Sequence, residues 1–318
     1  MELIRGLQNL IAQRRRNPAA GYVVTTGNFD GVHCGHQMIL RQLKERANEL
    51  QLPARVLIFE PQPMEFFAGS GAPARLTPFH EKVALILENG IDSVVCLHFN
   101  EALRNMPAGR FIEHILVDNL GVKSLIVGDD FRFGFKQSGD FELLREAGVK
   151  YGFSVSKNDT LVWDNHRVSS TRIRVALEDG DFALAEQLLG RPYSMSGRVM
   201  YGRQLGRTLG VPTANISLKG KKAPLQGVYA VQIAGLEKHG GVKLLQGVAN
   251  VGLRPTVDGE QPLLEAHIFD FSEQIYGERI RVIFRHKIRD ERKFDNVNLL
   301  REQILLDIAA AKKHFGLA

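Results

Sequence analysis

Through the first part of the chain, short apolar runs rich in β-branched and aromatic residues alternate with longer segments in which apolar residues recur at helical spacing. The strand-like runs are residues 22–26, 54–60, 93–98 and 123–127. The helical segments begin at Cys34 or span residues 79–89, 107–119, 141–151 and 181–190. Such alternation predicts an α/β domain with a parallel, doubly wound sheet, whose ligands bind beyond the carboxyl ends of the strands. Thr77 is expected to cap the helix from Phe79, with Pro78 at its first position.

The pattern changes near Gly190-Arg191-Pro192, where a glycine and a proline predict the end of a helix. Short strand-like runs follow, separated by Gly, Pro and charged turns with no helix between them: residues 193–201, 227–233, 246–251, 263–271 and 279–285. A final helical segment spans residues 297–315. This pattern predicts a small antiparallel β-barrel with a C-terminal helix. We therefore expect two domains, residues 1–189 and 190–318.

Composition adds little to the fold but narrows the function. The chain has 318 residues, of which 44% are hydrophobic and 24% charged, as in ordinary globular proteins. Cys34 and Cys96 form no C-x-x-C pair, and no apolar window is long enough for a signal peptide or a membrane span. We expect a cytoplasmic protein, without membrane association, that is a monomer or a weak oligomer. The net charge of +6 suits anionic small molecules such as nucleotides, and no nucleic-acid-binding signature accompanies it.

One stretch of the first domain, residues 22–40, combines a strand, a turn rich in Gly, Asn and Asp, and the start of a helix. The unpaired N–H groups and positive dipole end of such a helix favour an anion. His33 and His36 lie at the helix entrance and can share one side of its first turn. Two imidazole donors there suit the charge that grows on a phosphate during displacement at phosphorus. Ordinary surface histidines, a zinc site and a nucleophilic Cys34 remain the alternatives.

Two further loops follow strands or begin helices. Residues 128–139, GDDFRFGFKQSG, carry glycines, aromatic residues and polar groups, and the alternative to a binding loop is a self-packed Ω-loop. In residues 167–174, RVSSTRIR, a serine can cap a helix, and Ser170 shares a face with Arg174. A serine cap and an arginine at a helix N-terminus favour phosphate, although a capped helix with exposed arginines would look the same.

The second domain has a basic, glycine-rich run, residues 197–210, that leads into Val211-Pro212-Thr213-Ala214-Asn215. Backbone N–H groups of such a run can bind phosphates, but the run lacks the ending of a P-loop. In an extended segment Thr213 and Asn215 point to the same side. Their hydroxyl and amide oxygens suit Mg²⁺, and a polar strand edge is the alternative.

Glu265 lies in the strand-like segment LLEAHIFDF. Strand alternation puts Leu264, Ala266, Ile268 and Asp270 on one face and Leu263, Glu265, His267 and Phe269 on the other. A carboxylate among apolar strand residues is costly unless it is paired or has a use. A salt bridge to an arginine and a general base for catalysis are the two interpretations.

The motifs of the first domain resemble those of a known family. GNFDGVHCGH resembles the H-x-G-H signature of the Rossmann-like nucleotidyltransferase superfamily, in the form found in prokaryotic bifunctional riboflavin kinase/FMN adenylyltransferases (FAD synthetases). GDDFRFG and RVSSTRIR are similar to that family's later motifs and occur in the same order. The resemblance implies catalytic roles for His33 and His36. It implies ATP and phosphate binding by Gly27, Phe29, Asp30, His33, His36, Asp130, Arg167, Ser170, Thr171 and Arg174. Many relatives have Asn in place of Asp130.

The second domain continues the resemblance. GRTLGVPTAN is similar to the riboflavin kinase motif G-R-x-L-G-F-P-T-A-N, with Val211 in the usual Phe place, and ANVGLRPT and LEAHIFDF also match that family. The resemblance implies that Glu265 is the catalytic carboxylate and that Thr213 and Asn215 hold Mg²⁺. The residues implied to bind ATP or flavin are Gly206, Arg207, Thr213, Asn215 and Asn250.

The resemblance covers nearly the whole chain and implies a bifunctional enzyme of flavin cofactor synthesis. The barrel would phosphorylate riboflavin with ATP and Mg²⁺ to give FMN, and the α/β domain would transfer AMP from ATP to FMN, giving FAD and pyrophosphate. A nucleotidyltransferase for another phosphate, with the barrel as an accessory, is one alternative. A flavin-binding regulator without activity is another, against which the presence of His33, His36, Thr213, Asn215 and Glu265 argues.

Overall fold

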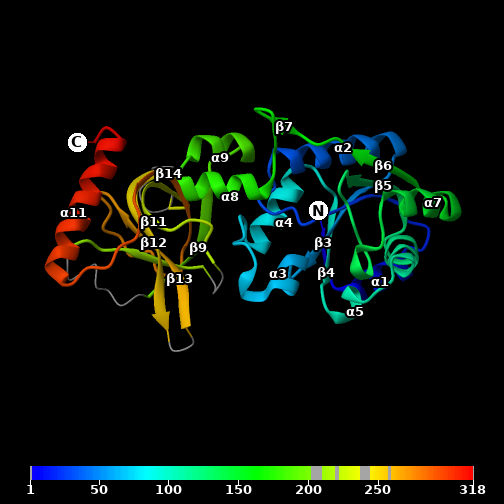
Figure 1. Cartoon of the computed structure of the whole chain (residues 1–318), viewed down its shortest axis with the longest axis horizontal. Coiled ribbons are helices and arrows are strands. Elements are labelled where there is room, and N and C mark those ends of the chain that lie inside the picture. Colours follow the sequence, from blue (N-terminus) through cyan, green and yellow to red (C-terminus); the bar gives the residue numbers. More distant parts are fainter. Residues whose placement is uncertain (1, 202–209, 219–221, 237–243, 257–258, 318) are drawn as a thin grey trace. The chain divides into compact units, whose positions relative to one another are not determined.

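The computed structural model describes residues 2–201, 210–218, 222–236, 244–256 and 259–317, with the backbone alone for 254–256 and 259–261. Figure 1 labels the helices and strands. The chain folds into two compact units. The first is Met1–Pro73 with Thr77–Ser169, and the second is Ala74–Leu76 with Ser170–Ala318. Within the described residues, no helix is long and apolar enough to cross a bilayer.

The first unit is built on a six-stranded sheet in the order β1-β4-β3-β2-β5-β6, with every pairing parallel. Its strands are β1 (Glu2–Arg5), β2 (Tyr22–Thr26), β3 (Ala54–Glu60), β4 (Ser93–His98), β5 (Val122–Gly128) and β6 (Ser154–Asn158). From β2 the chain adds β3 and β4 on one side, and it returns to add β5 and β6 on the other. The strand order therefore reverses between β2 and β5, where doubly wound sheets bind their ligands.

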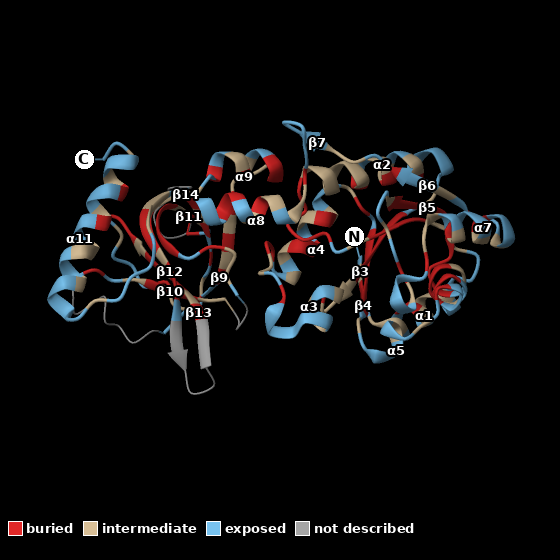
Figure 2. Cartoon of the chain, in the orientation of Figure 1, coloured by how far each residue is buried: buried red, intermediate tan, exposed pale blue. Residues whose placement is uncertain are grey.

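Helices cover both faces of this sheet. They are α1 (Leu7–Arg16), α2 (Cys34–Leu50), α3 (Pro63–Ala68), η1 (Gly69–Gly71), α4 (Phe79–Glu88), α5 (Glu101–Arg104), α6 (Ala108–Arg110), η2 (Phe111–Asn119), η3 (Phe135–Gln137) and α7 (Phe141–Tyr151). On β2, Val23 packs in a core with α2 and α4, whereas Val24 packs in a second core with α1, η2 and α7. Figure 2 shows the strands buried between these layers. The predicted doubly wound sheet is confirmed.

The structure corrects two details of the predicted helices. Pro78, rather than Thr77, is the N-cap of α4, because the Thr77 hydroxyl is used elsewhere, accepting a hydrogen bond from the Gly31 N–H at 2.9 Å. The segment predicted as one helix over 107–119 is a short α6 followed by the π-helical η2. Its end is marked by the bond from the Leu120 N–H to the Ile115 carbonyl at 2.9 Å.

Within its described residues, the second unit has the helices α8 and α9, a closed antiparallel barrel in the order β10-β13-β12-β11-β14-β9, and the last helix α11. The elements are α8 (Ser170–Asp179), α9 (Phe182–Leu189), β9 (Ser194–Met200), β10 (Ala214–Ser217), β11 (Gly227–Ala234), β12 (Leu245–Thr256), β13 (Gly259–Ile268), β14 (Arg279–Arg289) and α11 (Val297–His314). The predicted barrel and C-terminal helix are confirmed (Figure 1).

Both ends of the second unit pack on the barrel. The Ala311 side chain of α11 joins a buried cluster with Val228 and Ala230 of β11. The Phe182 ring of α9 lies 5.8 Å from the Tyr229 ring and 6.3 Å from the Phe284 ring. The α8–α9 pair therefore belongs physically to the barrel, although the change in sequence pattern falls after it.

This packing predicts the behaviour of two fragments. A fragment of residues 170–318 should be more stable than one of residues 190–318, because the shorter one loses Phe182 from the aromatic cluster. Removal of a buried phenylalanine typically costs about 3–5 kcal/mol of folding free energy. Chemical denaturation followed by circular dichroism measures the difference. Equal stability of the two fragments would mean that α9 contributes nothing to the barrel.

Candidate active sites

The loop between β2 and α2 has an unusual backbone. Phe29, Gly31 and Val32 have φ angles of 47°, 85° and 40°. Positive φ is common for glycine but strained for a β-branched residue such as Val32. The Thr77 hydroxyl accepts a bond from the Gly31 N–H at 2.9 Å, and the Thr77 N–H donates to the Asp30 carboxylate at 3.3 Å. These buried contacts hold the loop, and strained loops of this kind often occur at functional sites.

His33 and His36 come together at the end of this loop. His33 is the N-cap of α2, and its Nδ1 accepts a hydrogen bond from the His36 N–H at 3.3 Å. The two imidazole rings stack with centroids 3.6 Å apart, and the Phe29 ring lies 4.9 Å from that of His36. The predicted placement of both histidines on one side of the first turn is therefore found. Among the described side chains, the buried Nδ1 of His36 has no hydrogen-bond partner.

His36 is held in its neutral form. Burial is the main cause that lowers its pKa well below the ordinary 6.5. The His33 ring and the positive charges of Lys82 and Arg167 act in the same direction. A neutral imidazole offers one N–H donor and one acceptor, so His36 can bind a phosphate oxygen by a hydrogen bond while the cations supply charge.

Lys82 is a candidate that the motifs did not reveal. Its side chain is only 1% exposed, although lysine is seldom buried. It lies on α4, at helical spacing from the apolar Phe79 and Ile86. The sequence signal that could have identified Lys82 is its position, where the helical pattern of α4 predicts an apolar residue facing the core.

Arg167 lies on the hairpin of β7 (Val162–Trp163) and β8 (His166–Arg167) and contacts the loop after β5. Its guanidinium is 2.9 Å from the Asp130 carboxylate and 3.7 Å from that of Asp129. Its hydrogen bond to Asp130 raises the pKa of Arg167, and a bond from Thr160 lowers the pKa of Asp129. The structure thus brings together two of the predicted residues, Asp130 and Arg167.

Gly35 lets another segment approach the helix entrance. A Cβ atom at Gly35 would lie 3.2 Å from the His33 ring and 3.6 Å from the Val168 carbonyl. The residue after Arg167 is therefore close to the first turn of α2.

Ser170, Thr171 and Arg174 belong to α8, in the second compact unit. The helix begins at Ser170, within the segment 167–174 where the sequence predicted a helix start, and Thr171 is exposed. The Arg174 side chain donates from Nε to the Ala74 carbonyl at 2.6 Å. Arg174 therefore has a structural contact that the sequence did not suggest.

The predicted polar residues of the barrel lie in one row. The strand register pairs Asn215 of β10 with Glu265 of β13, and Glu265 with Asn250 of β12. Opposed residues of antiparallel strands share a face and have Cβ atoms about 4.5–5.5 Å apart. The neighbours Leu264 and Ala266 are fully buried on the other face, as the alternation predicted. A carboxylate and two amides are thus side by side on the outer face of the barrel.

Thr213 lies just before β10 and is half-buried, and its carbonyl accepts a bond from the Asn215 amide at 3.3 Å. Thr213 and Asn215 carry neutral oxygen donors of the kind that Mg²⁺ accepts beside phosphate. No group of three or more His, Cys, Asp or Glu side chains that could hold a metal ion occurs in the described part of the chain. Gly206 and Arg207 lie outside the described residues.

Comparison with known proteins finds one family for each part of the chain. The FAD synthetase family matches residues 15–172, and the riboflavin kinase family matches residues 189–315. The bifunctional riboflavin kinase/FMN adenylyltransferase of Escherichia coli K12 is 47% identical over 317 residues, which cover 100% of this chain and 99% of that protein. The protein of the same name from Pseudomonas fluorescens is 49% identical over 313 residues, 98% of this chain and 97% of that one.

A crystal structure from Streptococcus pneumoniae, described as a macrolide-efflux protein, has a TM-score of 0.74 and 31% identity, and it covers 91% of this chain and 93% of its own. The part of the chain with the α/β sheet matches one transferase family, and the part with the barrel matches another. A chain with both is a bifunctional transferase. The chain belongs to the family of bifunctional riboflavin kinases/FMN adenylyltransferases.

The lowered pKa of His36 predicts a pH dependence of folding. Below pH 6.5 the unfolded chain protonates this imidazole while the folded chain does not, so stability falls as the pH decreases toward the folded-state pKa. The slope for one proton approaches about 1.4 kcal/mol per pH unit. His36→Gln should remove this contribution, whereas the same change at the exposed His80 should not. Unfolding free energies measured from pH 7 downward, with an NMR titration of His36, test the sign. A His36 imidazole that titrates at or above 6.5 would contradict it.

Proposed function

We propose that residues 1–189 and residues 190–318 each carry one half of a two-step synthesis of FAD. In the first step ATP phosphorylates the ribityl 5′-hydroxyl of riboflavin to give FMN. In the second, AMP passes from another ATP to the FMN phosphate, and pyrophosphate leaves. The observation that supports this division is that the stacked histidine pair lies in the part matched to FAD synthetases, and the Asn215–Glu265–Asn250 row in the part matched to riboflavin kinases.

For adenylyl transfer, the FMN phosphate oxygen attacks the α-phosphorus of ATP, and the bond to pyrophosphate breaks. His33 and His36 would hydrogen-bond the phosphate oxygens on which negative charge accumulates, beside the N-terminus of α2. Gly27, Phe29 and Asp30 would shape the loop that presents them. Arg167 would exchange its Asp130 partner for a phosphate, an exchange favoured because that ion pair is half exposed. We also propose, from the resemblance of the motifs, that Ser170, Thr171 and Arg174 bind phosphate oxygens.

For phosphorylation, Glu265 would accept the proton of the riboflavin 5′-hydroxyl while that oxygen attacks the γ-phosphorus of ATP. ADP then leaves. Thr213 and Asn215 would hold Mg²⁺ against the ATP phosphates. Bound Mg²⁺ supplies charge neutralisation of the phosphates. Asn250, next to Glu265 in the row, would bind flavin or nucleotide, and Gly206 and Arg207 would bind ATP through the motif they share with riboflavin kinases.

We propose that the residues for adenylyl transfer lie within 1–189 and those for phosphorylation within 190–318. The helix α9 precedes this boundary, although it packs on the barrel. The substrates are small molecules, and the net charge of +6 suits the anionic nucleotides. We further propose a cytoplasmic monomer or weak oligomer that acts without nucleic acid or membrane.

The first activity is tested at His36. His36→Ala should lower FAD formation from supplied FMN by roughly two to three powers of ten, because a preorganised donor to the reacting phosphate is lost. Riboflavin phosphorylation in the same preparation serves as the control and should hardly change. Chromatography of the flavin products after incubation with ATP and Mg²⁺ measures both. If the two activities fall together, the histidine assignment is wrong.

The second activity is tested at Glu265. Glu265→Gln keeps the shape of the side chain and removes the base, so FMN formation should fall about 10²–10⁴-fold. The variant should still convert supplied FMN to FAD and still bind ATP. Phosphorylation of riboflavin at a near wild-type rate would rule out Glu265 as the base.

A further inference from the structure

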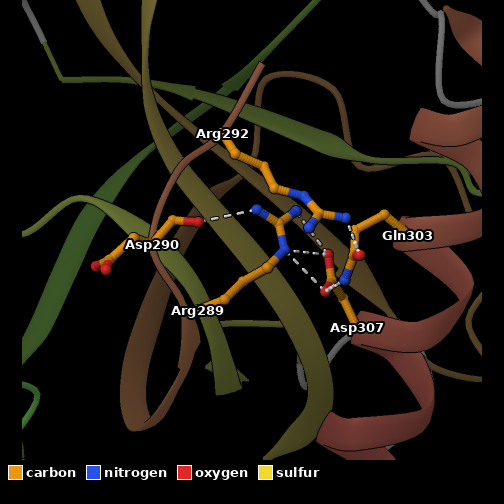
Figure 3. A network of polar contacts seen from close by, with 5 residues as sticks. All are labelled: Arg289, Asp290, Arg292, Gln303 and Asp307. Carbon is orange, nitrogen blue, oxygen red and sulfur yellow. Dashed lines mark hydrogen bonds and ion pairs between the residues drawn. The ribbon is translucent and has the colours of Figure 1, made fainter. Parts of the chain in front are cut away.

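The last residue of β14 is fixed to α11 by a buried ion pair. Arg289 donates to both carboxylate oxygens of Asp307, from Nε at 2.9 and 3.1 Å and from a terminal nitrogen at 2.8 Å. Asp307 is only 4% exposed and also accepts from Gln303 at 2.7 Å. Figure 3 shows Arg289 and Arg292 converging on these two residues of α11. The backbone on both sides of Glu291 is therefore anchored.

The side chain of Glu291 lies against β12 of the barrel. A Cβ atom at Gly252 would lie 2.9 Å from the Glu291 Cδ and 3.2 Å from the Asn250 Nδ2. A side chain at position 252 would therefore displace the Glu291 carboxylate. The carboxylate and the Asn250 amide thus both lie next to this glycine, and no motif of the sequence pointed to Glu291.

The location relates Glu291 to the candidate kinase site. Gly252 and Asn250 are two residues apart on β12, so they share the outer face and are separated by about 7 Å. Asn250 is paired with Glu265, the proposed base. Glu291, which covers Gly252, therefore lies beside one end of this row.

We propose that Glu291 and Asn250 bind a hydroxyl group of the ribityl chain of riboflavin, and that the Arg289–Asp307 pair positions Glu291 for this contact. The inference rests on the proposed kinase function of the barrel. A hydroxyl is both donor and acceptor, so a carboxylate that accepts beside an amide that donates is complementary to it. Hydrogen bonds to charged groups are also the stronger ones. Glu291 is then a specificity residue that selects flavins with a polyol side chain.

The test compares Glu291→Gln with Glu302→Gln, an equal change at an exposed residue of α11. The Glu291 variant should raise KM for riboflavin roughly tenfold to hundredfold, as expected for a lost hydrogen bond to a charged group. KM for ATP should stay within about twofold. Inhibition by lumiflavin, whose side chain is a methyl group, should be unchanged, because it lacks the hydroxyls. The Glu302 variant should match the wild type in all three measurements.

The positioning role is tested by Asp307→Asn, which should also raise KM for riboflavin. The double variant Glu291→Gln/Asp307→Asn should have the same KM for riboflavin as the Glu291 variant alone, because both changes remove the same contact. Fully additive effects would overturn the positioning role.

Other outcomes overturn the proposal itself. An unchanged KM for riboflavin in an active Glu291→Gln enzyme would exclude the contact, and so would a change confined to ATP. Equally weakened inhibition by lumiflavin would place Glu291 at the flavin ring instead. A wild-type chain that makes no FMN from riboflavin would overturn the proposed function, which is a distinct result.

Discussion

The histidine pair lies at the end of a strained turn that a distant segment holds in place. Backbone conformations such as those of Phe29 and Val32 cost about 1–3 kcal/mol each and persist when the surroundings determine them. Both side chains are 1% exposed, so their burial offsets part of this cost. Thr77 contributes the remaining restraint through its bonds to Gly31 and Asp30.

The electrostatics of this region follow from its burial. A buried imidazole next to cations is easier to keep neutral than charged, and the low pKa of His36 reflects both causes. The cations Lys82 and Arg167 come from α4 and from the β7–β8 hairpin, which are far apart in the chain. The fold therefore brings the neutral His36 imidazole together with separate positive charges. A neutral His36 avoids the repulsion that two charged histidines with ring centroids 3.6 Å apart would have.

In the barrel, the polar groups of the candidate site lie on the outer face, and the interior is apolar. Because side chains alternate along a strand, a slip of one residue would bury Glu265 and expose Leu264. Closure leaves no free edge along which the strands could slip, and the register aligns Asn215, Glu265 and Asn250 on the outside. The ion pair between Arg289 and Asp307 then ties the last helix to the same surface.

The sequence by itself determined the features that depend on local spacing. Alternation of strands and helices predicted the sheet, and Gly190 marked the end of the helix before the barrel, where the structure has it as the C-cap of α9. The polar strand β6, with residues 154–158, escaped detection, since its side chains are mostly exposed and carry no apolar pattern. The motif residues His33, His36 and Glu265 were also found from spacing and resemblance.

Only the tertiary structure decided which distant groups meet. Thr77 was predicted to cap a helix but restrains the β2–α2 turn. Lys82, which no motif singled out, is buried, and its charge acts on His36. The α8–α9 pair precedes the change in sequence pattern yet packs on the barrel through Phe182. Glu291 was recognised only because its side chain fills the space next to Gly252. Such contacts depend on how packed elements bring together residues far apart in the chain, and local periodicity carries no information about that.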